Sequence, residues 1–164
     1  MNKYVIFYII GWILNIEAAF MLLPSICAII YKEKSVFAFL ITIVICLFIG
    51  IPLSLRKPKN RVFFAKEGFL IVALAWIVIS IMGALPFYIS GQIPSYVDAL
   101  FEIISGFTTT GSSILTDIEA MDYCMLFWRS FAHWIGGMGV LVFLLAIFPM
   151  TDGESIHIMR AESP

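Results

Sequence analysis

The chain has 164 residues, of which 62% are hydrophobic and 13% are charged, and its formal net charge is -1. Because average soluble domains are about a quarter charged, this composition excludes an ordinary soluble domain. The near-neutral charge gives no indication of nucleic-acid binding. The apolar residues fall in long runs, which predicts an all-α integral membrane protein.

Residues 1–55 predict a leading transmembrane hairpin. Tyr4–Ile30 and Val36–Leu55 are both long enough to cross a bilayer core, which needs about 20 helical residues. The polar turn Tyr31–Ser35 is short, so the two spans should lie antiparallel. Pro24 is expected to kink the first span.

Two polar side chains, Asn15 and Glu17, interrupt the first span. A carboxylate at membrane depth costs about 3 kcal/mol or more, which makes Glu17 a functional candidate. The alternative is a protonated or hydrogen-bonded glutamate packed against a neighbouring helix. We favour the alternative, because no residue pairs with Glu17 by spacing.

The segment 56–67 is the most basic part of the chain and predicts a cytoplasmic linker by the positive-inside rule. The N-terminus would then be cytoplasmic and the Tyr31–Ser35 turn would lie outside. No lysine or arginine lies between Lys66 and Arg129, whereas Asp98, Glu102, Asp117, Glu119 and Asp122 all fall there. An acidic outer side would concentrate cations, although export alone also disfavours basic residues there.

Residues 68–150 predict a span, a half-length helix, a polar strip and a second span. The spans are 68–89 and 123–150, and the half-length helix is Tyr96–Phe107. Ser95 is a good N-cap for this helix, and Asp98 completes a pattern similar to a capping box. Twelve residues rise about 18 Å, which is roughly half of a bilayer. The arrangement is that of a re-entrant pore loop, and residues 151–164 would form a cytoplasmic tail.

The polar strip 108–112 is the candidate selectivity filter. Non-helical backbone survives in hydrocarbon only where it is buried in protein or lines a water-filled path. Backbone carbonyls of Thr108, Thr109, Thr110 and Gly111 would replace the water around a cation. Gly111 can adopt backbone angles that other residues resist. The carbonyl end of the half-length helix would add negative potential at the pore centre.

The segment Phe101–Asp117 closely resembles the first pore segment of bacterial Trk-type potassium uptake proteins, in the Trk/Ktr/HKT superfamily. Further stretches match as well: Glu67–Leu70, Gly83–Phe87, Phe127–Ser130, Trp134–Gly139 and Met159–Pro164. The resemblance implies two leading helices and four helix–pore helix–helix repeats around one pore. It also implies a homodimer, a cytoplasmic nucleotide-sensing regulatory subunit, and potassium held by the carbonyls of Thr108, Thr109, Thr110 and Gly111.

This chain holds only the leading hairpin and one repeat, and one quarter of a ring cannot enclose an ion. We expect an N-terminal fragment of a four-repeat protein, although four chains could instead assemble. The predicted function is passive potassium uptake across a bacterial inner membrane, with the filter opening outward. No cofactor is expected, because potassium is the transported substrate. The alternatives are a non-conducting membrane subunit with the same scaffold and, less favoured, a membrane enzyme.

Several other residues invite interpretation. Arg129 is expected to snorkel or to pair with an outer acid such as Asp117 or Glu119, a structural role that we favour over a direct role in the ion path. His133, four residues later, is expected to be a packed and hydrogen-bonded core residue and not a ligand. Mid-span glycines permit either helix bending and close backbone approach or ordinary small-residue packing. They are Gly136, Gly137 and Gly139. The cysteines lack metal or C-x-x-C spacing and are expected to be apolar filler. They are Cys27, Cys46 and Cys124.

Overall fold

The structure, a computed structural model, describes residues 3–56 and 65–147. This part of the chain is helical and contains no strand. Its helices are α1 (Lys3–Phe20), α2 (Leu22–Tyr31), α3 (Val36–Leu55), α4 (Ala65–Ile89), α5 (Tyr96–Phe107) and α6 (Tyr123–Ile147). Most of the basic segment 56–67 and the whole of the tail 151–164 lie outside the described residues.

Three segments of the described chain are long and apolar enough to cross a membrane: Tyr4–Tyr31, Val36–Leu55 and Gly68–Ile89. Their mean hydropathies are 2.1, 2.9 and 2.5, and at most 39% of each is buried inside the chain. The remaining apolar surface must therefore face lipid or other protein. The fourth predicted span corresponds to α6, which has 25 residues. Positions 148–150 of that prediction lie outside the described residues.

The first span bends between α1 and α2, as Pro24 predicts. The Met21 amide still donates to the Glu17 carbonyl at 3.0 Å, so the chain continues as one bent helix. Because Pro24 has no N–H, the Phe20 carbonyl loses its helical partner at the bend. The span ends where Lys32 adopts φ 55° and the Glu33 amide donates to the Ala28 carbonyl at 2.8 Å. This left-handed cap reverses the chain into α3.

The hairpin is packed closely where two glycines face each other. A Cβ at Gly50 on α3 would lie 2.4 Å from Asn15 Oδ1 and 3.0 Å from the Gly11 carbonyl oxygen on α1. Asn15 Nδ2 donates to Ser54 Oγ at 3.1 Å, which links the same two helices. Small residues let the helix backbones approach, and the amide adds an interhelical hydrogen bond.

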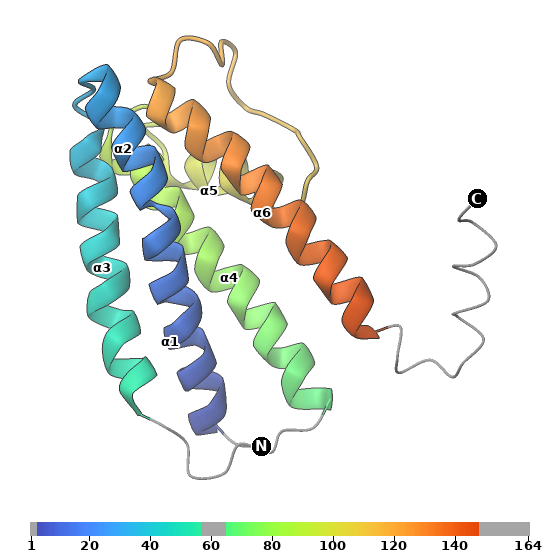
Figure 1. The fold of residues 1–164 in the computed structure, drawn as a ribbon. Helices are drawn as coiled ribbons and strands as arrows, with labels where there is room; N and C mark the ends of the chain where they lie inside the picture. Colours follow the sequence, from blue (N-terminus) through green and yellow to red (C-terminus); the bar gives the residue numbers. More distant parts are fainter. Residues whose placement is uncertain (1–2, 57–64, 148–164) are drawn as a thin grey trace, which may run out of the picture.

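The core that joins the hairpin to the rest of the chain is centred on Trp128 of α6, which is fully buried. Its indole Nε1 donates to the Gly83 carbonyl of α4 at 2.9 Å. Phe39 of α3 and Phe107 of α5 pack edge-on against its ring, with centroids 6.3 and 6.5 Å away. In Figure 1, α5 lies at the end of the bundle that holds α2, opposite the N-terminus. The hairpin and α5 therefore pack against the same residue of α6.

A second junction fixes the start of α6 to the turn between α2 and α3. The Glu33 carboxylate accepts from the Tyr123 amide at 2.7 Å and the Cys124 amide at 3.0 Å. Ser35 Oγ donates to Asp122, and the rings of Tyr31 and Tyr123 stack with centroids 4.5 Å apart. A carboxylate that accepts from free amides at a helix N-terminus is a favourable cap. The hairpin is thus attached to the N-terminal end of α6.

Candidate functional site

The half-length helix α5 begins and ends where the sequence predicts. Ser95 has extended backbone angles and its side chain accepts from the Asp98 amide at 3.4 Å, so the predicted N-cap is confirmed. The helix is held between α4 and α6 by its buried face, which includes Ile103, Gly106 and Phe107. It delivers the polar strip 108–112 at its C-terminus, where all five residues are exposed in this chain.

The backbone of the strip turns back on α5. The amides of Thr108 and Thr109 donate to the carbonyls of Ile104 and Gly106 at 2.8 and 2.9 Å. The amides of Thr110 and Gly111 both donate to the Ser105 carbonyl, at 3.0 and 3.4 Å. Two residues need left-handed angles to make this turn: Thr109 has φ 56° and Gly111 has φ 76°. The angle at Gly111 agrees with the predicted need for glycine there.

These amide contacts decide where the carbonyls of the strip point. In a trans peptide the C=O of one residue is antiparallel to the N–H of the next, and the described residues contain no cis bond. Because the amides of Thr109, Thr110 and Gly111 point into α5, the carbonyls of Thr108, Thr109 and Thr110 point away from it. The last carbonyls of α5 accept these amides, so the strip, and not the helix end itself, presents its carbonyls outward.

The threonine hydroxyls of the strip are engaged locally. Thr108 Oγ1 donates to the Ile104 carbonyl at 2.8 Å and also lies 2.8 Å from Thr110 Oγ1. Thr109 Oγ1 donates to the Thr108 carbonyl at 2.7 Å. Within the described residues, the carbonyl oxygens of Thr109, Thr110 and Gly111 accept no hydrogen bond. The hydroxyls therefore stiffen the strip and leave these carbonyls open.

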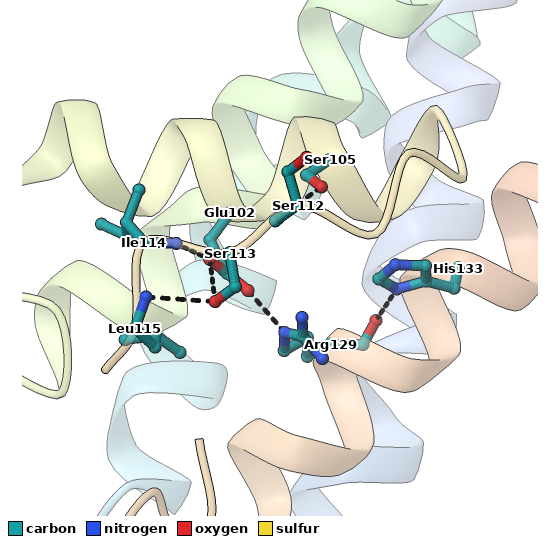
Figure 2. A network of polar contacts seen from close by, with 8 residues as sticks. All are labelled: Glu102, Ser105, Ser112, Ser113, Ile114, Leu115, Arg129 and His133. Carbon is teal, nitrogen blue, oxygen red and sulfur yellow. Dashed lines mark hydrogen bonds and ion pairs between the residues drawn. The ribbon is translucent and has the colours of Figure 1, made fainter. Parts of the chain in front are cut away.

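A buried carboxylate anchors the outer end of the strip (Figure 2). Glu102 of α5 is 1% exposed, and its Oε2 accepts from Ser113 Oγ at 3.0 Å and from the Ile114 amide at 3.2 Å. Its Oε1 accepts from Arg129 Nε of α6 at 2.5 Å. One turn further along α5, Ser105 Oγ donates to the Ser112 carbonyl at 2.6 Å. The strip is therefore held to α5 and α6 by side chains on its inner side.

Arg129 pairs with an acid, as expected, but with neither of the two acids that were named as examples. The sequence pointed to Asp117 or Glu119, whereas the structure pairs the guanidinium with Glu102. Asp117 Oδ1 instead accepts from the Glu119 amide at 3.1 Å, within its own loop. The difference arises because α5 packs against α6, which brings a residue of the half-length helix opposite Arg129. The ion pair also supplies the buried Glu102 carboxylate with the cation that it needs.

Two of the fourth-span glycines, Gly136 and Gly137, lie beside the end of α5 and the strip, whereas a Cβ at Gly139 would meet the Trp76 ring of α4 at 3.1 Å. A Cβ at Gly136 would meet the Phe107 carbonyl oxygen at 2.1 Å, so the backbones of α5 and α6 touch there. A Cβ at the neighbouring Gly137 would meet only Thr109 Cγ2, at 3.9 Å. His133 Nδ1 lies 3.0 Å from the Arg129 carbonyl oxygen, in agreement with a packed, hydrogen-bonded histidine. Of the two interpretations, close backbone approach holds at Gly136.

Glu17 lies outside this network. Its side chain is 5% exposed, and neither carboxyl oxygen has a hydrogen-bond partner among the described residues. A packed glutamate is confirmed, and the hydrogen-bonded version of that expectation is wrong.

The predicted cysteines are all free thiols, half-buried at Cys27 and buried at Cys46 and Cys124. The structure also brings ligand-type atoms of Glu33, Asp122 and Cys124 within 4.8 Å of one another. Sequence spacing gave no sign of this group, because Glu33 lies far from the other two in the chain. The amide bonds to the Glu33 carboxylate explain it as a helix cap.

Known proteins share both the sequence and the fold. Residues 33–164 match the family model TrkH, described as a cation transport protein. The chain is 38% identical over 160 residues to the Trk system potassium uptake protein TrkH of Escherichia coli K12. It is 33% identical over 162 residues to TrkG of the same organism. The match to TrkH includes 95% of this chain, and the match to TrkG includes 98% of it.

A solved structure agrees with these sequence matches. The crystal structure of the potassium transporter TrkH from Vibrio parahaemolyticus superposes with a TM-score of 0.84 at 34% identity. That match covers 91% of this chain and 32% of the transporter. The chain likewise spans about a third of the length of the curated E. coli relatives. The chain therefore belongs to the TrkH family of cation transport proteins and is a membrane protein.

Proposed function

We propose that this chain forms the first pore repeat, with its leading hairpin, of a potassium uptake transporter. In this proposal α4, α5 and α6 are the outer span, the pore helix and the inner span. The strip 108–112 is the selectivity filter, and the carbonyls of Thr108, Thr109, Thr110 and Gly111 coordinate the ion. Permeation is passive, so no cofactor and no catalytic residue is assigned.

The observation that carries this proposal is the orientation of the strip. Its amides donate into α5, its hydroxyls are satisfied locally, and its carbonyls point to an exposed surface of an otherwise apolar molecule. Such a surface is tolerable at membrane depth only beside a water-filled path or other protein. Rows of backbone carbonyls are the oxygen ligands that replace the hydration shell of potassium in channels.

One strip cannot surround an ion, so the proposal requires further repeats. We place them in the same polypeptide, since this chain spans about a third of its relatives; four copies of the chain are the alternative. The relatives named above are called potassium uptake proteins, which supports potassium as the substrate. A homodimer of the full-length protein and a cytoplasmic nucleotide-binding regulatory subunit complete the proposal.

The proposed orientation follows from charge. The basic segment 56–67 lies in the cytoplasm, as does the N-terminus, and the filter opens to the outside of the inner membrane. The membrane potential then drives cations inward with about 2.3 kcal/mol per 100 mV for each charge. A non-conducting subunit with the same scaffold would need neither the open carbonyls nor this orientation.

The test compares two glycines that have the same backbone strain. Gly111 and Gly91 both have φ 76°, and a Cβ at either position would meet nothing within 4 Å. An alanine should cost each about 1–2 kcal/mol of left-handed strain, so its effect on folding is matched. We expect Gly111→Ala in the full-length protein to lower rubidium uptake about tenfold and to weaken discrimination against sodium, whereas Gly91→Ala should transport normally. Equal uptake by both variants would support the non-conducting alternative.

A further inference from the structure

The carboxyl group of Glu17 on α1 is buried between helices of this chain. Its Oε1 is 3.4 Å from the position that a Cβ on Gly83 of α4 would occupy. The same position is 3.1 Å from the Ile103 side chain and 3.2 Å from the Phe107 ring of α5. The carboxyl therefore lies beside Gly83 of α4, the same residue against which side chains from the C-terminal half of α5 pack.

Among the described residues, no lysine or arginine is shown to pair with this carboxyl. Neither oxygen of Glu17 accepts a hydrogen bond among the described residues, although the side chain is 5% exposed. The segments 35–55 and 67–128 contain no lysine or arginine, so α3, α5 and the described side chains of α4 present none. Arg129 of α6 is engaged by Glu102. The titratable side chain that interacts with Glu17 from α3 is the Cys46 thiol, which cannot supply a positive charge.

The electrostatic cost of burying a charge determines whether this carboxyl is ionised or binds a proton. An isolated ionised carboxylate in a low-dielectric interior costs tens of kcal/mol in the Born limit, and in practice such a group takes up a proton instead. The carboxyl is buried inside this chain, so a hydrated cation or another repeat cannot reach the oxygens in place of a proton.

We propose that Glu17 is a proton-binding site that stays neutral at physiological pH and keeps the wall behind the first pore helix free of charge. The unfolded carboxyl, in water, is ionised at neutral pH. Folding of this region therefore takes up a proton, and stability should fall as the pH rises. Removal of the proton would place a charge beside Gly83, the α4 residue against which the Phe107 ring packs. The protonation state of the Glu17 carboxyl on α1 would thus affect the packing between α4 and α5.

The test is infrared spectroscopy of the full-length protein in lipid bilayers at neutral pH. A protonated carboxyl has a carbonyl stretch that a carboxylate lacks. We expect the wild-type spectrum to contain one such band that is missing from Glu17→Gln. The matched control is Glu33→Gln, because the Glu33 oxygens only accept hydrogen bonds, as an ionised carboxylate does. This control should retain the band.

A second measurement follows thermal unfolding with pH. Wild-type protein should lose more stability than Glu17→Gln as the pH is raised from about 5 upward, because the unfolded carboxyl ionises above its ordinary pKa of about 4.3. A carboxylate band, and not a protonated one, lost in Glu17→Gln would overturn the proposal. So would failure of both neutral variants, Glu17→Gln and Glu17→Met, to reach the membrane, since a neutral site should accept them. Neither readout requires ion conduction, so its failure is distinct from failure of the pore proposal.

Discussion

A methyl group added at Gly136 is the smallest change that should disturb the strip without touching it. The Cβ of Gly136→Ala would lie 2.1, 2.7 and 2.9 Å from the carbonyl oxygen, carbonyl carbon and Cα of Phe107. Carbon–oxygen contacts ordinarily lie at about 3.3–3.6 Å. The added Cβ is fixed to the backbone of α6 and the Phe107 atoms belong to the backbone of α5, so neither can rotate away. The two helices must therefore separate by roughly an ångström at this point.

The size of the effect follows from this geometry. Overpacking a tight contact typically costs about 1–3 kcal/mol, and relief through the backbone moves the peptide that joins Phe107 to Thr108. Each 1.4 kcal/mol corresponds to about tenfold in rate, so uptake through a displaced filter should fall about tenfold or more. If α6 moves and the filter does not, the clash should instead appear as reduced thermal stability of the protein.

The assay is rubidium uptake by the full-length protein in cells that lack their own potassium transporters, normalised to the amount in the membrane. Gly137→Ala is the matched control: it carries the same change on the same helix, but its Cβ would meet only Thr109 Cγ2 at 3.9 Å. We expect this control to stay within about twofold of wild type, because such a contact is ordinary van der Waals packing. Wild-type uptake and stability in Gly136→Ala would refute the close contact between α5 and α6.

Two further predictions concern the strip anchor and the leading hairpin. Breaking a buried ion pair costs about 3–5 kcal/mol, and the cost is lower when one partner is partly exposed, as Arg129 is. Glu102→Gln should therefore lower rubidium uptake at least about tenfold. The control Glu119→Gln changes an exposed residue and should leave uptake unchanged. Equal uptake by these two variants would contradict the anchoring role. Gly50→Ala should lower the thermal stability by about 1–3 kcal/mol, because its Cβ would lie 2.4 Å from Asn15 Oδ1. The same change should cost less in an Asn15→Ala background, and purely additive effects would argue against this clash.

Local signals in the sequence were sufficient to predict individual helices. Hydropathy placed Val36–Leu55, which is α3, and the cap at Ser95 placed the start of α5. Pro24 predicted the bend between α1 and α2. Each of these depends on residues within a few positions of one another, for which helix periodicity and capping rules are adequate.

Contacts between distant segments were not predictable in the same way. Arg129 was assigned an acid in the neighbouring loop, whereas its partner lies 27 positions earlier on α5. The cap that Glu33 provides for α6 joins residues about 90 positions apart. Both depend on which faces of the helices pack together, and several helices of this chain are apolar on all sides. A sequence pattern cannot choose a packing face on such helices.

The candidate filter illustrates both cases. Its location could be predicted because Thr108–Ser113 is polar within an apolar chain, and the need for glycine at position 111 agrees with φ 76°. The direction in which its carbonyls point could not be predicted, because it depends on strip amides that donate to the carbonyls of Ile104, Ser105 and Gly106. The sequence led us to expect the end of α5 to face the ion, whereas the strip covers that end.

The direct test of the proposed filter is to locate the ion. Crystals of the full-length protein grown with rubidium or thallium in place of potassium would reveal bound ions by anomalous scattering. We predict an anomalous peak within coordination distance of the carbonyl oxygens of Thr108, Thr109, Thr110 and Gly111. Strong peaks elsewhere in the protein, with none beside this strip, would contradict the assignment.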